Sequence, residues 1–264
     1  MRVESVTSAQ NRKVKTLLVL QEKARLRKEM GLFVVEGRRE LEHCVRAGFE
    51  IDTLFYCPEI PGPTPDPQIL QAAAQVIEVP KELYAKIAYR EGTEGMVAEV
   101  KVRERELGEL MLPENPLVVV LEGVEKPGNL GAVLRSADAA GADAVLVCDP
   151  LTDLFNPNLI RASIGAVFTV PVVCCSSQDA IKWLKDNNIN IFTAQLQDSS
   201  WYYDTDMKGG TAIVIGTEAT GLTAAWREAA DAHIRIPMLG ELDSLNASVS
   251  AAILLFEAVR QRNA

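Results

Sequence analysis

Histidine is scarce in this sequence: its 264 residues include only two, His43 and His233. Catalysis by a histidine base therefore has few candidates, and His233 begins the apolar segment HIRIP, where a structural role is the stronger interpretation. The five cysteines form no C-x-x-C pair, and Cys148, Cys174 and Cys175 lie in or beside apolar runs. A disulfide framework or a zinc site is not expected, and no metal is predicted.

Long apolar runs are also absent. No stretch of about 18 or more apolar residues occurs, so a membrane-spanning segment is not expected. The N-terminal segment MRVESVTSAQNRKVK lacks the apolar core of a signal peptide, which favours a cytoplasmic location. With 264 residues, 48% of them hydrophobic, the chain can form two modest domains or one large domain.

Basic residues are concentrated at one end of an acidic chain. The net charge is −9, yet residues 1–40 contain ten Lys and Arg against five Asp and Glu, which leaves −14 on the remainder. A basic segment attached to an acidic body is typical of a phosphate-binding surface. On this feature alone, a solvated charged helix face explains the pattern equally well.

The first hundred residues alternate between strand and helix patterns. Asn11 is a suitable N-cap for a helix that extends to about Arg27. Four apolar segments are predicted to be strands: GLFVVEG, DTLFYC, QVIEVP and GMVAEV. This alternation predicts a small α/β domain over residues 1–105. The charged stretch KVRERELGELMLPEN interrupts it, so a linker is placed at residues 106–115.

From residue 116 the strand pattern starts again. Six short apolar segments follow one another, with helical patterns between them: LVVVLEGV, AVLVCD, FTVPVV, INIFTAQ, TAIVIG and HIRIP. Nearly continuous apolar strands of this kind predict a parallel sheet that is covered on both faces. Since ligands bind beyond the carboxyl ends of such strands, we expect the chemistry in the loops that follow them.

The first polar segment, residues 121–143, is predicted to be a strand, a turn and a helix. Asn129 can cap the helix after the Pro127-Gly128 turn, and Arg135 lies off its apolar face. Taken singly, the two are an ordinary cap and an ordinary solvated arginine. The glycine spacing does not match the dinucleotide-binding fingerprint, which disfavours a nucleotide-dependent oxidoreductase. The apolar face is predicted to comprise Leu130, Val133, Leu134 and Ala137.

Two further segments combine a strand with a polar loop. In residues 212–222 a buried strand enters a loop flanked by Gly216 and Gly221, from which Glu218 projects. In residues 234–262 a strand ends, a loop follows, and Ser244 can cap a long helix. The inner face of that helix is predicted to comprise Val249, Ile253, Phe256 and Val259 or Arg260.

The order and spacing of these motifs resemble the SpoU (TrmH-like) family of RNA 2′-O-ribose methyltransferases, a branch of the SPOUT superfamily. The motifs are NLGAVLRSA (129–137), GTEATGL (216–222) and IPMLGELDSLN (236–246). Each is weak alone, whereas three in order are specific. The resemblance covers residues 116–264. The preceding part is similar to the small ribosomal-protein-like α/β domain that binds substrate in many members.

The resemblance implies a C-terminal parallel-sheet domain with a deep trefoil knot, a homodimer, and S-adenosylmethionine as the cofactor. It assigns Arg135 to activating the ribose hydroxyl. Because guanidinium stays protonated, anchoring phosphate and stabilising alkoxide charge is the safer role. The residues implied as catalytic are Asn129, Arg135, Glu218, Ser244 and Asn246. Those implied in cofactor binding are Thr193, Ala194, Gln195, Gly216, Gly221, Ile236, Met238 and Leu245.

RNA is the implied partner, and ribosomal RNA is favoured over tRNA because of the extra N-terminal domain. The basic segment would bind phosphates, and the candidate residues are Arg12, Lys13, Lys15, Arg38 and Arg39. Three alternatives remain at this point: a tRNA 2′-O-methyltransferase, a drug-resistance methylase that acts on one rRNA nucleotide, and a non-catalytic RNA-binding or ribosome-assembly factor on the same fold.

Overall fold

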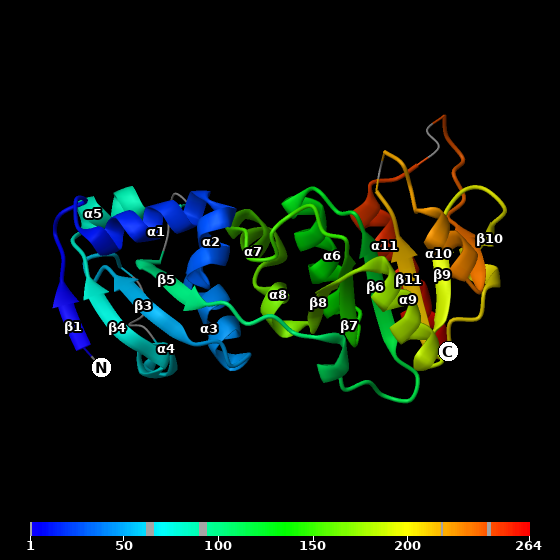
Figure 1. Cartoon of the computed structure of the whole chain (residues 1–264), viewed down its shortest axis with the longest axis horizontal. Helices are drawn as coiled ribbons and strands as arrows, with labels where there is room; N and C mark the ends of the chain where they lie inside the picture. The colour runs from blue at the N-terminus through cyan, green and yellow to red at the C-terminus, as the bar shows by residue number, and fades with distance from the viewer. Residues whose placement is uncertain (1, 62–65, 90–93, 218, 242–243) are drawn as a thin grey trace. The chain divides into compact units, whose positions relative to one another are not determined.

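The computed structural model of the chain describes residues 2–61, 66–89, 94–217, 219–241 and 244–264 (Figure 1). The chain forms two compact units. The first combines Met1–Arg103 with Asp153–Thr169, and the second combines Glu104–Thr152 with Val170–Ala264. Within the described ranges, no helix is long and apolar enough to cross a lipid bilayer.

The first unit is built on a five-stranded mixed sheet with the order β1-β4-β3-β5-β2. Its strands are β1 (Arg2–Ser5), β2 (Leu32–Glu36), β3 (Ile51–Tyr56), β4 (Ala73–Glu78) and β5 (Met96–Lys101). The helices of its N-terminal segment are α1 (Arg12–Glu22), α2 (Ala24–Met30), α3 (Arg38–Arg46), α4 (Pro67–Ala72) and α5 (Lys81–Ile87). The expected small α/β fold is therefore confirmed, and β1 is an addition that the sequence pattern did not predict.

The first helix begins as predicted and ends earlier. The Asn11 side chain accepts a hydrogen bond from the Lys13 backbone N–H at 2.9 Å, which confirms it as the N-cap. Lys23 is extended (φ −108°, ψ 98°) and separates α1 from α2. The predicted helix to Arg27 is therefore two helices.

Two short helices from the later part of the chain, α7 (Pro157–Ser163) and α8 (Ala166–Thr169), belong to the first unit. Phe155 stacks on Phe33 with ring centroids 4.3 Å apart, and Phe168 packs edge-on against Phe49 at 5.3 Å. The buried Arg27 Nε donates to Asp153 Oδ2 at 2.6 Å. The sequence pattern predicts residues 153–169 to lie within the C-terminal domain, because chain order carries no sign of this packing.

The second unit contains the predicted parallel sheet. Its seven strands have the order β10-β12-β9-β11-β6-β7-β8, and every adjacent pair is parallel. The strands are β6 (Leu117–Glu122), β7 (Ala144–Cys148), β8 (Val172–Cys175), β9 (Asn190–Ala194), β10 (Ser200–Trp201), β11 (Thr211–Ile215) and β12 (Ala232–Arg235). Predicted strand FTVPVV is shortened to β8, because Phe168 and Thr169 end α8.

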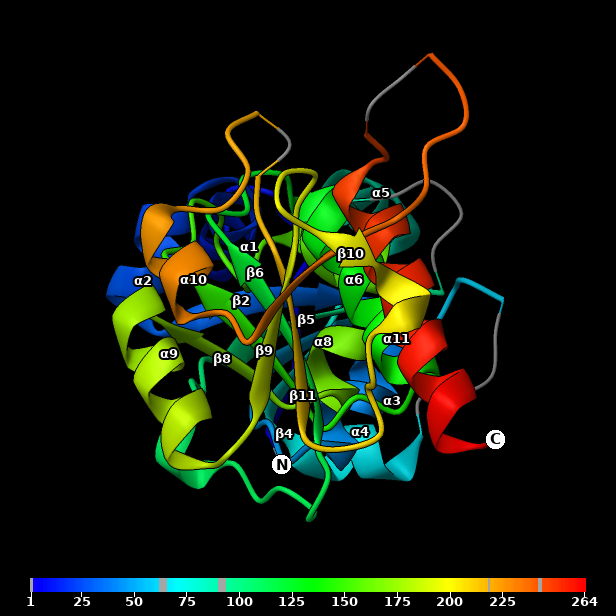
Figure 2. The same cartoon turned by 90° about the vertical axis from the view of Figure 1, so that its right-hand side faces the viewer.

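Helices cover both faces of this sheet, as near-continuous apolar strands require. Figure 2 shows α6 and α11 on one side of the strands, and α9 and α10 on the other. Trp226 of α10 and Leu184 of α9 are fully buried against the strands. The bounds are α6 (Pro127–Ala139), α9 (Ser177–Asp186), α10 (Ala224–Ala229) and α11 (Ala247–Arg262), with single 3-10 turns at Leu107–Glu109 and Tyr202–Asp204.

Both predicted helix caps of the motif segments were wrong. Helix α6 begins at Pro127 with Lys126 as its N-cap residue, because proline has the φ of a first helical turn and needs no N–H there. Asn129 therefore lies inside the first turn. The N-cap of α11 is Asn246 and not Ser244, and its side chain accepts from the Ser248 N–H at 3.0 Å.

The predicted apolar face of α6 is confirmed, whereas the predicted inner face of α11 was wrong. Val249 and Phe256 are 46% and 48% exposed. The helix instead buries the side that carries Ala251, Leu254, Leu255 and Ala258. Because α11 has apolar residues on both sides, its periodicity could not decide which side faces the sheet.

Candidate active site

Four strands of the second unit deliver polar loops to one edge of the sheet. Strands β6, β9, β11 and β12 are mutually parallel, so their carboxyl ends lie at the same edge. The three motif segments follow β6, β11 and β12. A fourth loop, after β9, joins them there. This edge is where an open parallel sheet binds its ligands.

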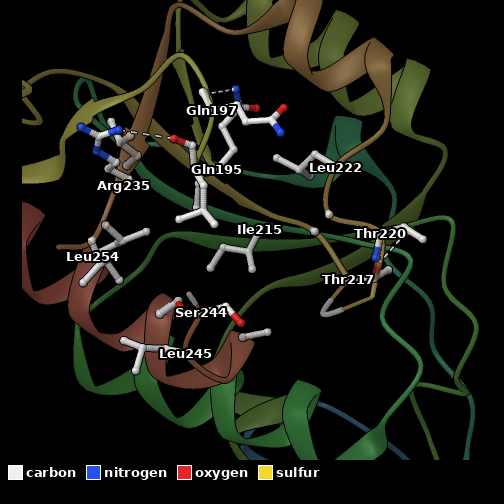
Figure 3. A pocket seen from close by; sticks show the side chains of 18 of the residues that line it. Gln195, Gln197, Ile215, Thr217, Thr220, Leu222, Arg235, Ser244, Leu245 and Leu254 are labelled. Carbon is white, nitrogen blue, oxygen red and sulfur yellow. Dashed lines mark hydrogen bonds between the residues drawn. The ribbon is translucent and has the colours of Figure 1, made fainter. Parts of the chain in front are cut away.

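A cavity of about 490 Å³ opens between these loops (Figure 3). It is lined by residues 194–197 after β9, by 215–217 and 219–222 after β11, and by 234–236 and Met238 after β12. Ser244, Leu245, Ala247, Ser250 and Leu254 close it from the α11 side. A volume of this size suits one small organic ligand.

Two residues that line this cavity each have a buried polar atom with no hydrogen-bond partner within the described part of the chain: Gln195 Oε1 and Arg235 Nε. Burial without a partner is costly for both an amide oxygen and a guanidinium N–H. Another guanidinium nitrogen of Arg235 donates to the Leu196 carbonyl at 3.5 Å, and Arg235 lies over the Trp201 ring at 4.2 Å. The acceptor and the donor left over are complementary to a ligand with polar groups.

In the loop after β11, the backbone at Gly216 and Thr217 lies close to the backbone at Gly221, and this close approach is the neck of the loop. Gly221 N donates to the Thr217 carbonyl at 3.1 Å, and Thr220 N donates to Thr217 Oγ1 at 3.1 Å. Gly221 has φ +68°, which a side chain would oppose. A Cβ on Gly216 would lie 2.4 Å from the Gly221 carbonyl carbon, so only glycine fits there. Both glycines are explained by this closure, which exposes backbone groups to the cavity.

The first and third motifs meet beside this loop. Asn246 Nδ2 donates to Asn129 Oδ1 at 3.2 Å, although the two residues are 117 positions apart. Asn129 lines a smaller cavity of about 130 Å³, together with Glu122, Lys126 and Thr217. Ile215, Gly216, Thr217, Ala219 and Ala247 line both cavities. The two cavities therefore adjoin each other, and Asn129 lines the smaller one.

The structure brings most of the predicted site residues to these two cavities. Those that line the larger one are Ala194, Gln195, Gly216, Gly221, Ile236, Met238, Ser244 and Leu245. Arg135 is exposed on α6, and Glu218 lies outside the described residues. Thr193 is fully buried, and its hydroxyl hydrogen-bonds His233 Nδ1 at 2.6 Å, so it supports the sheet beneath the cavity.

Several lining residues were not predicted from the sequence. Thr217 and Thr220 line the cavity within the glycine loop, Arg235 ends β12, and Arg227 lies one turn into α10. The signal that could have found the first three is their position at or just beyond the carboxyl end of a buried strand. Arg227 has no such signal, because its place depends on how α10 folds back.

Comparison with known families decides the class of this site. The model of the SpoU rRNA Methylase family matches residues 116–256, which is more than half of the chain. The chain belongs to this family. A second match, to the MRM3-like substrate binding domain, covers residues 11–98. The resemblance stated from the motifs is thus confirmed for both parts of the chain.

Relatives and a solved structure extend over nearly the whole chain. The 23S rRNA (guanosine(2553)-2'-O)-methyltransferase RlmP of Bacillus subtilis is 28% identical over 96% of this chain and 98% of its own length. The 23S rRNA (uridine(2479)-2'-O)-methyltransferase of Streptomyces viridochromogenes is 31% identical, over 89% and 85%. The AdoMet-bound rRNA methyltransferase of Sinorhizobium meliloti is 30% identical, covers 98% of both chains and superposes with a TM-score of 0.88.

Proposed function

We propose that this SpoU family protein transfers a methyl group from S-adenosylmethionine to a ribose 2′-hydroxyl of ribosomal RNA. The observation that carries the proposal is the convergence of the three motif segments on two adjacent cavities, joined by the Asn129–Asn246 hydrogen bond. One cavity has room for the cofactor, and the other adjoins the polar residues of the first motif.

The larger cavity fits the cofactor in both size and chemistry. Ile236, Met238 and Leu245 offer apolar surface to an adenine ring, and backbone groups at Gly216, Ile236 and Leu245 would hold it by hydrogen bonds. Gln195 Oε1 can accept from an amino group, and Arg235 Nε can donate to a hydroxyl or carboxylate. Ala194 and Gly221 complete the binding surface, and Thr193 acts beneath it. When bound, the cofactor supplies a sulfonium methyl group.

Five polar residues, of which Asn129 lines the smaller cavity, act on the substrate. A ribose hydroxyl is a poor nucleophile at neutral pH and must lose its proton as it attacks. Arg135 anchors a substrate phosphate and stabilises the negative charge that develops on the oxygen. Asn129 and Asn246, linked by their side chains, orient the ribose. Ser244 and Glu218 complete the polar set.

RNA capture is assigned to the first unit. Arg12 and Lys15 are exposed at the start of α1, where they are available for phosphate oxygens. Lys13, Arg38 and Arg39 each form an ion pair with a glutamate of the same unit, at 2.6, 2.7 and 3.0 Å. They can turn to RNA only by giving up those pairs, so Arg12 and Lys15 are the principal contacts.

Charge reversal at Arg12 and Lys15 together is expected to weaken RNA binding roughly tenfold at physiological salt, because two phosphate contacts are lost. The slope of log affinity against log salt should also fall, by about one for each contact. Filter binding across a salt series measures both. Lys182→Glu, at an exposed residue of α9 in the second unit, controls for the reversal of a surface charge away from the first unit. If the double variant and the parent bind RNA with equal affinity, the RNA-binding surface lies elsewhere on the protein.

The assembly and setting follow from the same family membership. We infer a homodimer, a trefoil knot in the C-terminal region and a cytoplasmic location. Support for the dimer comes from α11, where Val249 and Phe256 lie two turns apart and are about half exposed. Apolar side chains gathered on one helix face are typical of a protein–protein contact.

The proposed function is tested by incubating the protein with S-adenosylmethionine and purified ribosomal RNA, then mapping 2′-O-methylated nucleotides. Cellular RNA with and without the gene provides the second arm. A single ribosomal position that depends on the protein in both arms is the expected result. Methylation of tRNA alone would identify tRNA as the substrate and the protein as a tRNA 2′-O-methyltransferase. Absence of a dependent position in any RNA would refute the enzymatic proposal.

A further inference from the structure

A buried carboxylate, Glu122, lies at the end of β6 and is only 6% exposed. It accepts three hydrogen bonds. The Thr223 N–H donates to Oε2 at 2.9 Å, and the Thr223 hydroxyl donates to Oε1 at 2.7 Å. The Ser177 hydroxyl donates to Oε1 at 3.2 Å. No role in the three motifs accounts for this residue, which precedes the first of them.

The Thr223 N–H, from which Glu122 accepts a hydrogen bond, belongs to the Leu222–Thr223 peptide group. Charged side chains bind both the N–H and the C=O of this group. The carbonyl of the same peptide, on Leu222, accepts from Arg227 Nε at 3.1 Å and from Arg227 Nη2 at 2.8 Å. A carboxylate therefore holds the N–H of the Leu222–Thr223 peptide while a guanidinium holds its C=O. Hydrogen bonds with charged partners are the strongest that a peptide group makes. This peptide is thus fixed in one orientation.

That peptide ends the loop that lines the cofactor cavity. Leu222 is 4% exposed and lines the cavity directly, as Gly221 does before it. The other end of the loop, Gly216, follows β11, which pairs with β6 in register. Because Glu122 belongs to β6, its hydrogen bonds connect the C-terminal end of the loop to the strand that pairs with β11, where the loop begins.

The hydrogen bonds of Glu122 form two arms: the contacts with Thr223 are the loop arm, and the contact with Ser177 begins a core arm. The Ser177 hydroxyl that donates to Glu122 also accepts from Trp226 Nε1 at 2.9 Å, and Trp226 is fully buried. This arm joins α9 and α10 to the sheet, and neither Ser177 nor Trp226 lines either cavity. The two arms can therefore be tested separately, one for the loop and one for the core.

We propose that Glu122 is a positioning residue for cofactor binding, which acts with Arg227 by fixing the Leu222–Thr223 peptide and so the closed form of the glycine loop. The proposal rests on the proposed function, because it takes the larger cavity as the cofactor site. Glu122 contacts no reacting atom in this scheme. A neutral amide keeps one oxygen for the Thr223 N–H but must turn its NH₂ group toward the Thr223 and Ser177 hydroxyls, so the hydrogen bonds lose their negatively charged acceptor.

The variant Glu122→Gln keeps the shape of the side chain and tests this role. Its dissociation constant for S-adenosylmethionine, measured by calorimetry, is expected to rise roughly ten- to hundredfold. KM for the cofactor should rise in parallel, while kcat at saturating cofactor changes by less than about threefold. Thr223→Val, which removes one hydroxyl contact and retains the N–H, should show a smaller rise of about threefold to tenfold.

Two controls separate positioning from stability. Ser177→Ala breaks the core arm, so its melting temperature should fall while its cofactor affinity stays within about twofold of the parent. Glu228→Gln repeats the substitution on an exposed residue of α10 and should change neither quantity. A parent that fails to bind S-adenosylmethionine would sink the cofactor assignment itself. A parent that binds, together with Glu122→Gln and Thr223→Val of unchanged affinity, would overturn the role of Glu122 alone.

Loss of affinity in Ser177→Ala equal to that in Glu122→Gln would also overturn the proposal, because it would reduce Glu122 to a stabiliser of the core. If Glu122→Gln does not fold, Thr223→Val decides the matter by itself. Its side chain is exposed, so its effect on folding is small. An affinity unchanged in that folded variant contradicts the proposal, and a rise with normal kcat supports it.

Discussion

Arg135→Ala is expected to lower the rate of methyl transfer by about 100- to 1,000-fold, the usual cost of removing one group that stabilises transition-state charge. Arg135 is exposed on α6 and is not one of the described residues lining the larger cavity. Its loss should therefore leave affinity for S-adenosylmethionine within about twofold of the parent. Single-turnover assays with radiolabelled cofactor measure the rate, and calorimetry measures the affinity.

The form of the arginine side chain allows a sharper comparison. Arg135→Lys keeps the positive charge and loses the planar fork that binds phosphate oxygens in pairs, so an intermediate rate is expected. Lys182→Ala, at an exposed residue of α9, controls for the loss of one surface cation. A normal rate in Arg135→Ala would refute the assigned role. If Arg135→Ala loses as much cofactor affinity as it loses rate, Arg135 belongs to the cofactor site.

Gly216→Ala is expected to reduce cofactor affinity by about a hundredfold or more, because the added methyl group cannot be accommodated at the neck of the loop. Its Cβ would lie 2.4 Å from the Gly221 carbonyl carbon and 2.6 Å from both the Gly221 oxygen and the Leu222 nitrogen. All three atoms belong to the backbone, which cannot rotate away as a long side chain does. The loop must open to relieve the overlap, and its cavity-lining groups move with it.

Gly209→Ala is the matched control for this substitution. Nothing lies within 4 Å of a Cβ on Gly209, and the residue is remote in sequence from the loop. The two variants should differ in calorimetric affinity for S-adenosylmethionine and in methyl transfer, with both proteins still unfolding cooperatively. Tight cofactor binding by Gly216→Ala would contradict both the closed loop and the assignment of the larger cavity.

The sheet of the second unit was predictable because its strands are buried along their whole length. Strands β6, β7 and β11 consist of residues buried on both faces, so an uninterrupted apolar run predicts each one. Helix α11 was placed correctly and oriented wrongly. Its exposed side carries Val249 and Phe256, and a sequence that is apolar all round does not distinguish contact with the sheet from contact with another surface.

The candidate site was predictable as far as strand ends determine it. Motif spacing indicated which loops gather at one edge, and the contact between Asn129 and Asn246 agrees with that expectation. The partners of Glu122 and Arg227 were not predictable. Both hold the same peptide of a loop that lies about a hundred residues from Glu122 and directly before α10. Such contacts depend on the path of the backbone, and residue types alone do not encode it.

Exchanging domains within this family would face a constraint set by residues 153–169. They come from within the stretch matched by the methylase model, yet Phe155 and Phe168 pack with Phe33 and Phe49, and Asp153 pairs with Arg27. A chimera joined only near residue 104 would bring a foreign α7–α8 segment to this aromatic cluster, and a segment without an acid in the place of Asp153 would leave Arg27 buried without its carboxylate. Recombination that preserves folding needs three junctions, so the N-terminal domain of the donor must be transferred together with its own α7–α8 segment.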